Sequence, residues 1–117
     1  MATEKIKPNY KKVEILPSAA RVISGLSDEF YTYGYNELDG AIKATADTAL
    51  TSLDADVEAY DPTINDWVVI GSFTQIVATP STAEGINILS GLRYKCRINY
   101  TFVGTSVTFA VGIILRV

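Results

Sequence analysis

Three carboxylate side chains recur at every second position in the middle of the chain. Asp54, Asp56 and Glu58 alternate with apolar residues, so a β-strand would carry all three on one face. Such a group suggests a calcium site or a carboxylate pair for hydrolysis. Calcium sites, however, usually gather oxygens from loops that wrap the ion, and glycosidase carboxylates face one another across a cleft. Because neighbours on one strand point in parallel, we expect a solvated acidic face and no metal site.

Three cationic side chains show the same spacing nearer the C-terminal end. Arg93, Lys95 and Arg97 alternate with Tyr94 and Cys96. A basic stripe alone suggests nucleic-acid binding, but this chain also carries the matching acidic stripe. Charge pairing explains both stripes, either across neighbouring strands of one sheet or between subunits. A cross-strand pair contributes only ~0.2–1 kcal/mol, so such pairs would set register or partner choice more than stability.

Catalytic chemistry finds few suitable groups in this chain. The sequence contains no histidine and a single cysteine, Cys96. It therefore has no Ser-His-Asp or Cys-His arrangement, no zinc site of a usual type and no disulfide within one chain. Cys96 shares the apolar side of its segment with Ile98, which indicates an inert core residue. We expect a non-enzymatic protein that binds no cofactor and no metal.

The most aromatic stretch of the chain is a candidate contact surface. It contains Phe30, Tyr31, Tyr33 and Tyr35. Tyrosine suits interfaces because its ring buries a large area while its hydroxyl stays hydrogen-bonded. Alternatively, these rings cover one open end of the fold. Trp67 could stack on a sugar, although a single tryptophan in a β-sandwich is more often a core or inter-sheet residue.

The elements that must position these residues are strands. Residues 53–60, 93–103 and 106–117 alternate apolar and polar side chains, and a turn at Gly104 makes the last two a long β-hairpin. Residues 67–73 are apolar on both faces, which predicts a central strand. Further short strands are expected at 13–16, 41–46 and 86–89. The pattern predicts an all-β antiparallel sandwich, Ig-like or jelly-roll-like, with seven to eight strands.

A polar arm at residues 1–12 precedes a single domain at 13–117. The arm carries four of the ten Lys and Arg residues and has few apolar side chains. One interpretation is a frayed terminus, and the other is an extended arm that orders on a neighbouring subunit. For the second, the expected contact residues in the arm are Lys5, Ile6, Lys7 and Tyr10.

Composition limits the remaining function classes. The chain has 117 residues, which is one domain, and 48% of them are hydrophobic against 20% charged. Its net charge of −3 argues against direct nucleic-acid binding, which needs a basic surface. No apolar run approaches the ~20 residues of a membrane span, and no apolar signal core follows Met1. We therefore expect neither a membrane partner nor Sec-type export.

The order of signals resembles small β-sandwich structural proteins of tailed bacteriophages, of the kind encoded near head genes. The similarity covers about residues 16–117. Its motifs are Leu16-Pro17-Ser18-Ala19-Ala20-Arg21, Asp61-Pro62 with Trp67 a turn later, Arg93-Tyr94-Lys95-Cys96-Arg97-Ile98, Gly104-Thr105-Ser106 and Phe109-Ala110-Val111-Gly112. The family offers no catalytic residues to carry over.

The resemblance implies a component of the virion, made in the host cytoplasm. Such proteins include capsid decoration or cement proteins and other head-associated proteins. The implied partners are the major capsid protein, other virion proteins or further copies of this chain as a homo-oligomer. The alternative is an Ig-like carbohydrate- or receptor-binding module that uses Trp67 and the tyrosines Tyr31, Tyr33 and Tyr35.

Overall fold

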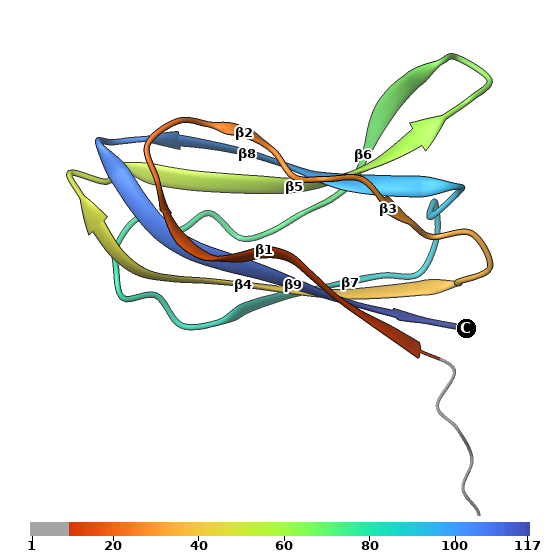
Figure 1. Ribbon diagram of the computed structural model, residues 1–117, viewed down its shortest axis with the longest axis horizontal. Helices are drawn as coiled ribbons and strands as arrows, with labels where there is room; N and C mark the ends of the chain where they lie inside the picture. Colours follow the sequence, from red (N-terminus) through yellow and green to blue (C-terminus); the bar gives the residue numbers. More distant parts are fainter. Residues whose placement is uncertain (1–9) are drawn as a thin grey trace, which may run out of the picture.

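The computed structural model describes residues 10–117, which form nine strands and no helix that could span a membrane. The strands make two antiparallel sheets that pack face to face (Figure 1). Sheet A contains β1 (Tyr10–Arg21), β9 (Ser106–Arg116), β4 (Glu37–Thr48) and β7 (Glu84–Ile88), in that order. Sheet B contains β2 (Gly25–Leu26), β8 (Lys95–Val103), β5 (Ser52–Asp61) and β6 (Asp66–Ser72), and β3 (Phe30–Tyr31) also pairs with β8. The predicted antiparallel sandwich is confirmed, and the two-residue strands β2 and β3 raise the strand number above the expected seven to eight.

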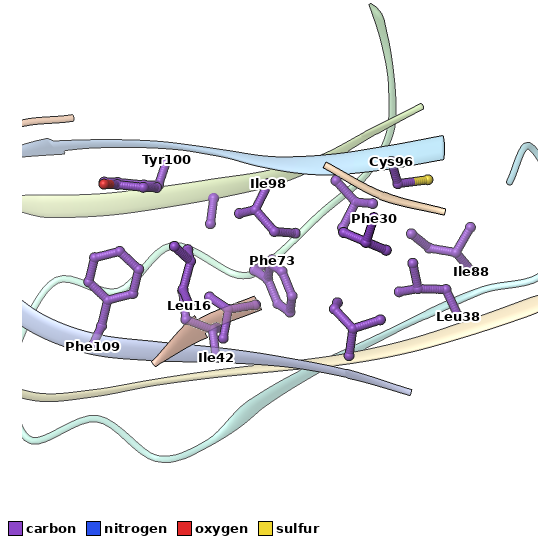
Figure 2. Close-up of a cluster of buried hydrophobic side chains, with 14 of the residues drawn as sticks. Leu16, Phe30, Leu38, Ile42, Phe73, Ile88, Cys96, Ile98, Tyr100 and Phe109 are labelled. Carbon is purple, nitrogen blue, oxygen red and sulfur yellow. The ribbon is translucent and has the colours of Figure 1, made fainter. Parts of the chain in front are cut away.

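Alternating side chains build one core between the two sheets. Every second residue is buried from Cys96 to Tyr100 in β8 and from Val107 to Leu115 in β9, while the residues between them are partly or fully exposed. A sheet with one apolar face must cover it, and here each sheet covers the other. Figure 2 shows the buried side chains meeting from both layers, with Ile98 and Tyr100 on one side and Ile42 and Phe109 on the other.

The expected hairpin between residues 93 and 117 does not form. β8 lies in sheet B and β9 in sheet A, so the turn at Gly104 carries the chain from one sheet to the other. Only glycine fits at position 104 in this turn. Its φ is +152°, and a Cβ there would lie 2.7 Å from the Ala49 carbonyl oxygen. Ala49 belongs to another connection between the two sheets, from β4 to β5. Either arrangement buries the apolar face of each strand between the sheets, so the alternation alone does not distinguish a hairpin from a crossover.

β1 is longer than expected at both ends. It begins at Tyr10 and continues past Pro17 to Arg21, and two register shifts interrupt its ladder with β9. Proline is tolerated here because β1 is an edge strand and bulged, so no ladder bond needs its missing N–H. The Arg21 guanidinium donates hydrogen bonds to three backbone carbonyls around this end and lies 4.5 Å from the Phe109 ring. The expected arm boundary at residue 12 therefore falls inside a strand, and the contact residues expected at Lys5, Ile6 and Lys7 lie outside the described residues.

β6 is an edge strand, not the central strand that its apolar sequence predicts. It pairs only with β5, and the β5–β6 hairpin projects beyond the sheets in Figure 1. Ile70 still packs against the core. A Cβ at Gly71 would lie within 3 Å of Ile86 and Ile88 of β7, in the opposite layer. The apolar residues of β6 therefore serve two purposes. Those on one face pack toward the core, and those on the other lie on the outer surface of sheet B.

Candidate interaction surface

A row of large side chains crosses the outer face of sheet B. Register places Tyr31 of β3 beside Lys95 of β8, and Tyr60 of β5 beside Trp67 of β6. The Lys95 ammonium lies 5.0 Å from the Tyr60 ring centroid and 5.7 Å from that of Trp67. The Tyr60 and Trp67 rings meet edge to face at 5.4 Å. These four residues, which we call the aromatic row, come from four strands that only the folded sheet brings together.

An ion pair between Arg97 and Glu58 lies next to the aromatic row and contacts Trp67. They are cross-strand partners in β8 and β5, and Arg97 Nε donates to Glu58 Oε1 at 2.7 Å. The two side chains are only 20% and 11% exposed, and Asn99 also donates to the Glu58 carboxylate. The Arg97 guanidinium also stacks 4.1 Å from the Trp67 ring centroid. One face of the Trp67 ring is thus occupied by a cation of the same chain.

The acidic stripe of β5 and the basic stripe near β8 meet as cross-strand partners only at Glu58 and Arg97. Opposite Asp54 and Asp56 across the β5–β8 ladder stand Thr101 and Asn99. Asp54 instead accepts hydrogen bonds from the Gln75 amide. The expected pairing across neighbouring strands therefore describes only Glu58 and Arg97.

The other two cations of the basic stripe reach acids outside the acidic stripe. Arg93 Nη1 lies 2.7 Å from Asp61 Oδ2, and Lys95 Nζ lies 2.8 Å from Glu29 Oε1. The hydrogen bond to Glu29 raises the pKa of Lys95 above its ordinary value. The Thr63 hydroxyl and backbone N–H both donate to Asp61, and with Arg93 they hold the pKa of Asp61 below its usual range. Lys95 and Asp61 therefore stay charged at neutral pH.

The structure divides the expected tyrosine-rich surface. Phe30 is buried in the core and Tyr35 packs against it, so neither ring is presented to a partner. Tyr31 and Tyr33 are 59% and 77% exposed. The Tyr31 ring meets the ring of Tyr94 edge to face at 5.4 Å, and Tyr94 is 48% exposed.

Sequence reasoning missed Tyr60 and Tyr94 as surface residues. Tyr94 was expected on the core side with Cys96, but it precedes the first residue of β8 and escapes that alternation. Tyr60 follows Glu58 at strand spacing, and this signal places it on the outer face. The turn between Asp61 and Asp66 is the tip of the β5–β6 hairpin. Asn65 there has a φ of 55°, and its side chain accepts a hydrogen bond from the Tyr60 hydroxyl.

Cys96 is buried in the core, as its spacing predicts. Burial raises the pKa of its thiol to about 11, although the Thr32 hydroxyl contact opposes this. The thiol is therefore protonated at neutral pH and a poor nucleophile. Among residues 10–117, no three acidic, histidine or cysteine side chains gather in a way that could hold a metal ion.

No family model and no curated protein match this sequence. Solved structures do share its fold. The SPBc2 prophage-derived protein YomS superposes with a TM-score of 0.58 at 18% identity, over 97% of this chain and 99% of YomS. The PBSX exported protein XepA superposes with a TM-score of 0.65 at 12% identity, over 97% of this chain and 40% of XepA.

The same fold occurs in proteins of different functions. VP2 of the infectious bursal disease virus subviral particle superposes with a TM-score of 0.62 at 6% identity, over 95% of this chain and 33% of VP2. A Clostridium thermocellum xylanase 10B fragment with a CBM22-1 module, complexed with xylohexaose, has a TM-score of 0.53 at 12% identity, over 93% of this chain and 26% of the fragment. At such identities the likeness shows the fold, and function has to be argued from the surface.

Proposed function

We propose that this chain is a non-enzymatic structural protein of a bacteriophage particle, a decoration or head-associated protein that binds the capsid lattice. The observation that carries the proposal is the exposed tyrosine pair Tyr31 and Tyr94, in which Tyr94 extends the aromatic row beyond Tyr31. Tyrosine, tryptophan and arginine are enriched at protein–protein interfaces and among the residues that carry their binding free energy. The surface is built on strands of a two-layer sandwich, so its side chains are held in place before binding.

The fold comparisons support the phage part of the proposal. YomS, a prophage-derived protein, matches nearly the whole of both chains, and VP2 forms a viral particle with the same fold. A small sandwich suits such a role because a particle offers many identical sites. Repeated attachment to a lattice multiplies modest individual contacts without any new contact in the chain.

A sugar-binding role for the same surface has weaker support. Arg97 already covers a face of Trp67, and Lys95 lies over the Tyr60 ring. Tyr35, a member of the expected tyrosine set, packs against the core. A flat stacking platform for a sugar would need ring faces open to solvent. The geometry therefore favours a protein partner over a glycan.

Mass spectrometry of purified particles tests the proposal. Particles of the phage or prophage whose genome encodes the chain should contain it in a fixed ratio to the major capsid protein. Its absence from washed particles, with the protein present in the lysate, would overturn the virion assignment. Binding of the purified protein to a panel of neutral polysaccharides, with none to particles, would favour the glycan-binding alternative.

A variant pair tests the surface. The double variant Tyr31→Ala/Tyr94→Ala should bind particles about tenfold more weakly or worse, because interface tyrosines commonly carry most of the binding free energy. The matched control is Ile64→Ala, which removes an equally exposed apolar side chain at the tip of the β5–β6 hairpin. If both variants bind particles equally well, the contact surface lies elsewhere on the chain.

A further inference from the structure

The outer face of sheet A holds a shallow groove that the aromatic row does not involve. Its volume is about 450 Å³, and it runs between β1, β4 and β9. Ala41, Gly112 and Ile114 make its apolar part, and Lys12 and Glu14 stand along its β1 side. On the β4 side, Asp39 lies beside Ile114 and pairs with Arg116. The β1–β9 ladder is interrupted just beside it, between Val13 and Leu16 in register. A surface hollow with apolar walls and charges on its rim has the form of a contact site.

Gly112 in this groove has no explanation within the described chain. It lacks the positive φ that turns require, and a Cβ added there would meet no heavy atom within 4 Å. By contrast, a Cβ at Gly40 would lie 2.9 Å from the Phe73 ring, so internal packing explains that glycine. Glycine inside a strand weakens it and commonly marks the close approach of another backbone or a ligand. Gly112 therefore points to something outside the monomer.

The groove is complementary in shape to itself. Ile114 lies two residues after Gly112 on the same face of β9, so a protrusion and a hollow stand side by side. A second copy turned by 180° about an axis that crosses the strands level with Ile113 would place its Ile114 over this Gly112. The same rotation places this Ile114 over the second copy's Gly112. Both contacts arise from one symmetry operation, as in an isologous interface.

The same rotation also pairs opposite charges on the rim of the groove. Lys12 and Glu14 have the spacing of Ile114 and Gly112, and Lys12 is in register with Ile114. The rotation therefore brings Lys12 of each copy over Glu14 of the other. Within residues 10–117, neither side chain has an ion-pair partner. A partner with the opposite order of charges is needed, and a rotated copy of this chain has it.

We propose that the chain forms a two-fold dimer by packing the outer face of sheet A against the same face of a second copy. Four strands at ~4.8 Å spacing and the eleven residues of β9 give a face of roughly 700 Å² per copy. This is close to the ~800 Å² per partner of a standard interface, so the face is large enough for a specific dimer. The dimer does not depend on the proposed function, because it leaves the outer face of sheet B free for another partner.

Sedimentation velocity of the full chain over the micromolar range tests the dimer. The wild-type chain should pass from monomer to dimer with rising concentration. Gly112→Val fills the hollow and should raise the dimer dissociation constant about tenfold or more. Thr101→Val, which adds an apolar side chain on the outer face of sheet B, is the control and should dimerise as the wild type does.

A charge exchange tests the symmetry without altering the core. Lys12→Glu and Glu14→Lys should each weaken the homodimer, since each puts like charges opposite one another. The double variant Lys12→Glu/Glu14→Lys should dimerise again. An equimolar mixture of the two single variants should form a heterodimer, because every contact between them then joins opposite charges.

The proposal fails if the wild-type chain stays monomeric at every concentration, or if it assembles only into rings or larger species. It also fails if the mixed single variants associate no better than each alone. Circular dichroism and thermal melting of each variant verify the fold. If Gly112→Val does not fold, the charge exchange still decides, since Lys12 and Glu14 are both exposed.

Discussion

The two outer faces of the sandwich differ sharply although both sheets share one core. The outer face of sheet B carries a row of large aromatic and cationic side chains with mutual contacts. The outer face of sheet A carries small residues around Gly112 and leaves a groove. Inward positions on both sheets must fill the same interior, so they are similar. Outward positions have no such constraint, and the difference between the faces is where interaction specificity can reside.

Removing Arg97 should give the largest stability effect and separate the two faces. Arg97→Ala leaves the Glu58 carboxylate buried without its ion-pair partner and uncovers Trp67, so we expect a loss of about 2–3 kcal/mol in unfolding free energy. On sheet A, Arg116 pairs with Asp39 and Glu37 but is 43% exposed. Arg116→Ala should cost less than ~1 kcal/mol. Urea denaturation of both variants provides the measurement.

A second substitution separates the charge effect from lost packing. Glu58→Gln in the Arg97→Ala background removes the unpaired carboxylate, so it should recover part of the lost stability. Equal losses for Arg97→Ala and Arg116→Ala would contradict the comparison and make the sheet B pair an ordinary surface contact.

Acid should destabilise the protein through two carboxylates near the ends of strands, Asp47 of β4 and Asp61 of β5. The Thr79 hydroxyl and the Leu50 backbone N–H lower the pKa of Asp47, and the groups around Asp61 lower its pKa as well. A carboxyl whose folded pKa lies below its unfolded value of about 3.9 stabilises the fold above that pH. This contribution is lost as the pH falls through the folded pKa.

Melting temperature measured between neutral pH and about pH 2 should therefore fall below about pH 4. Asp61→Asn keeps the side-chain shape and removes the charge, so its acid-induced fall should be smaller than that of the wild type. A melting temperature that does not change with pH in this range would show that Asp47 and Asp61 do not stabilise the native state.

Filling Gly112 should give the smallest effect on the monomer, and of the opposite sign. At concentrations where the chain is monomeric, Gly112→Val should raise the unfolding free energy by up to about 1 kcal/mol, because valine suits strands and open space surrounds the site. Gly40→Val, which points into the core, is the matched control and should destabilise. A destabilising Gly112→Val would mean that the groove side of β9 is packed within the monomer.

Much of the fold could be predicted from local patterns, and most of the surface could not. The alternation at residues 53–60 is confirmed as β5, and burial of Cys96 follows from the same alternation. The hairpin at 93–117 was wrong, because alternation states that one face is buried but not which sheet buries it. The prediction that β6 is a central strand was wrong. Its outer face is apolar because Trp67 there contacts Tyr60 in the aromatic row, not because a second sheet buries that face.

The sequence by itself determined the all-β class, the two-faced strands and the scarcity of catalytic groups, because each depends on residue type and spacing along one segment. Only the tertiary structure decided that Tyr31, Lys95, Tyr60 and Trp67 form one row, that Glu58 alone of the acidic stripe meets Arg97, and that Gly112 opens onto a groove. The physical reason is strand pairing. Long-range backbone hydrogen bonds choose the neighbours and the register, and register determines which side chains touch across a sheet.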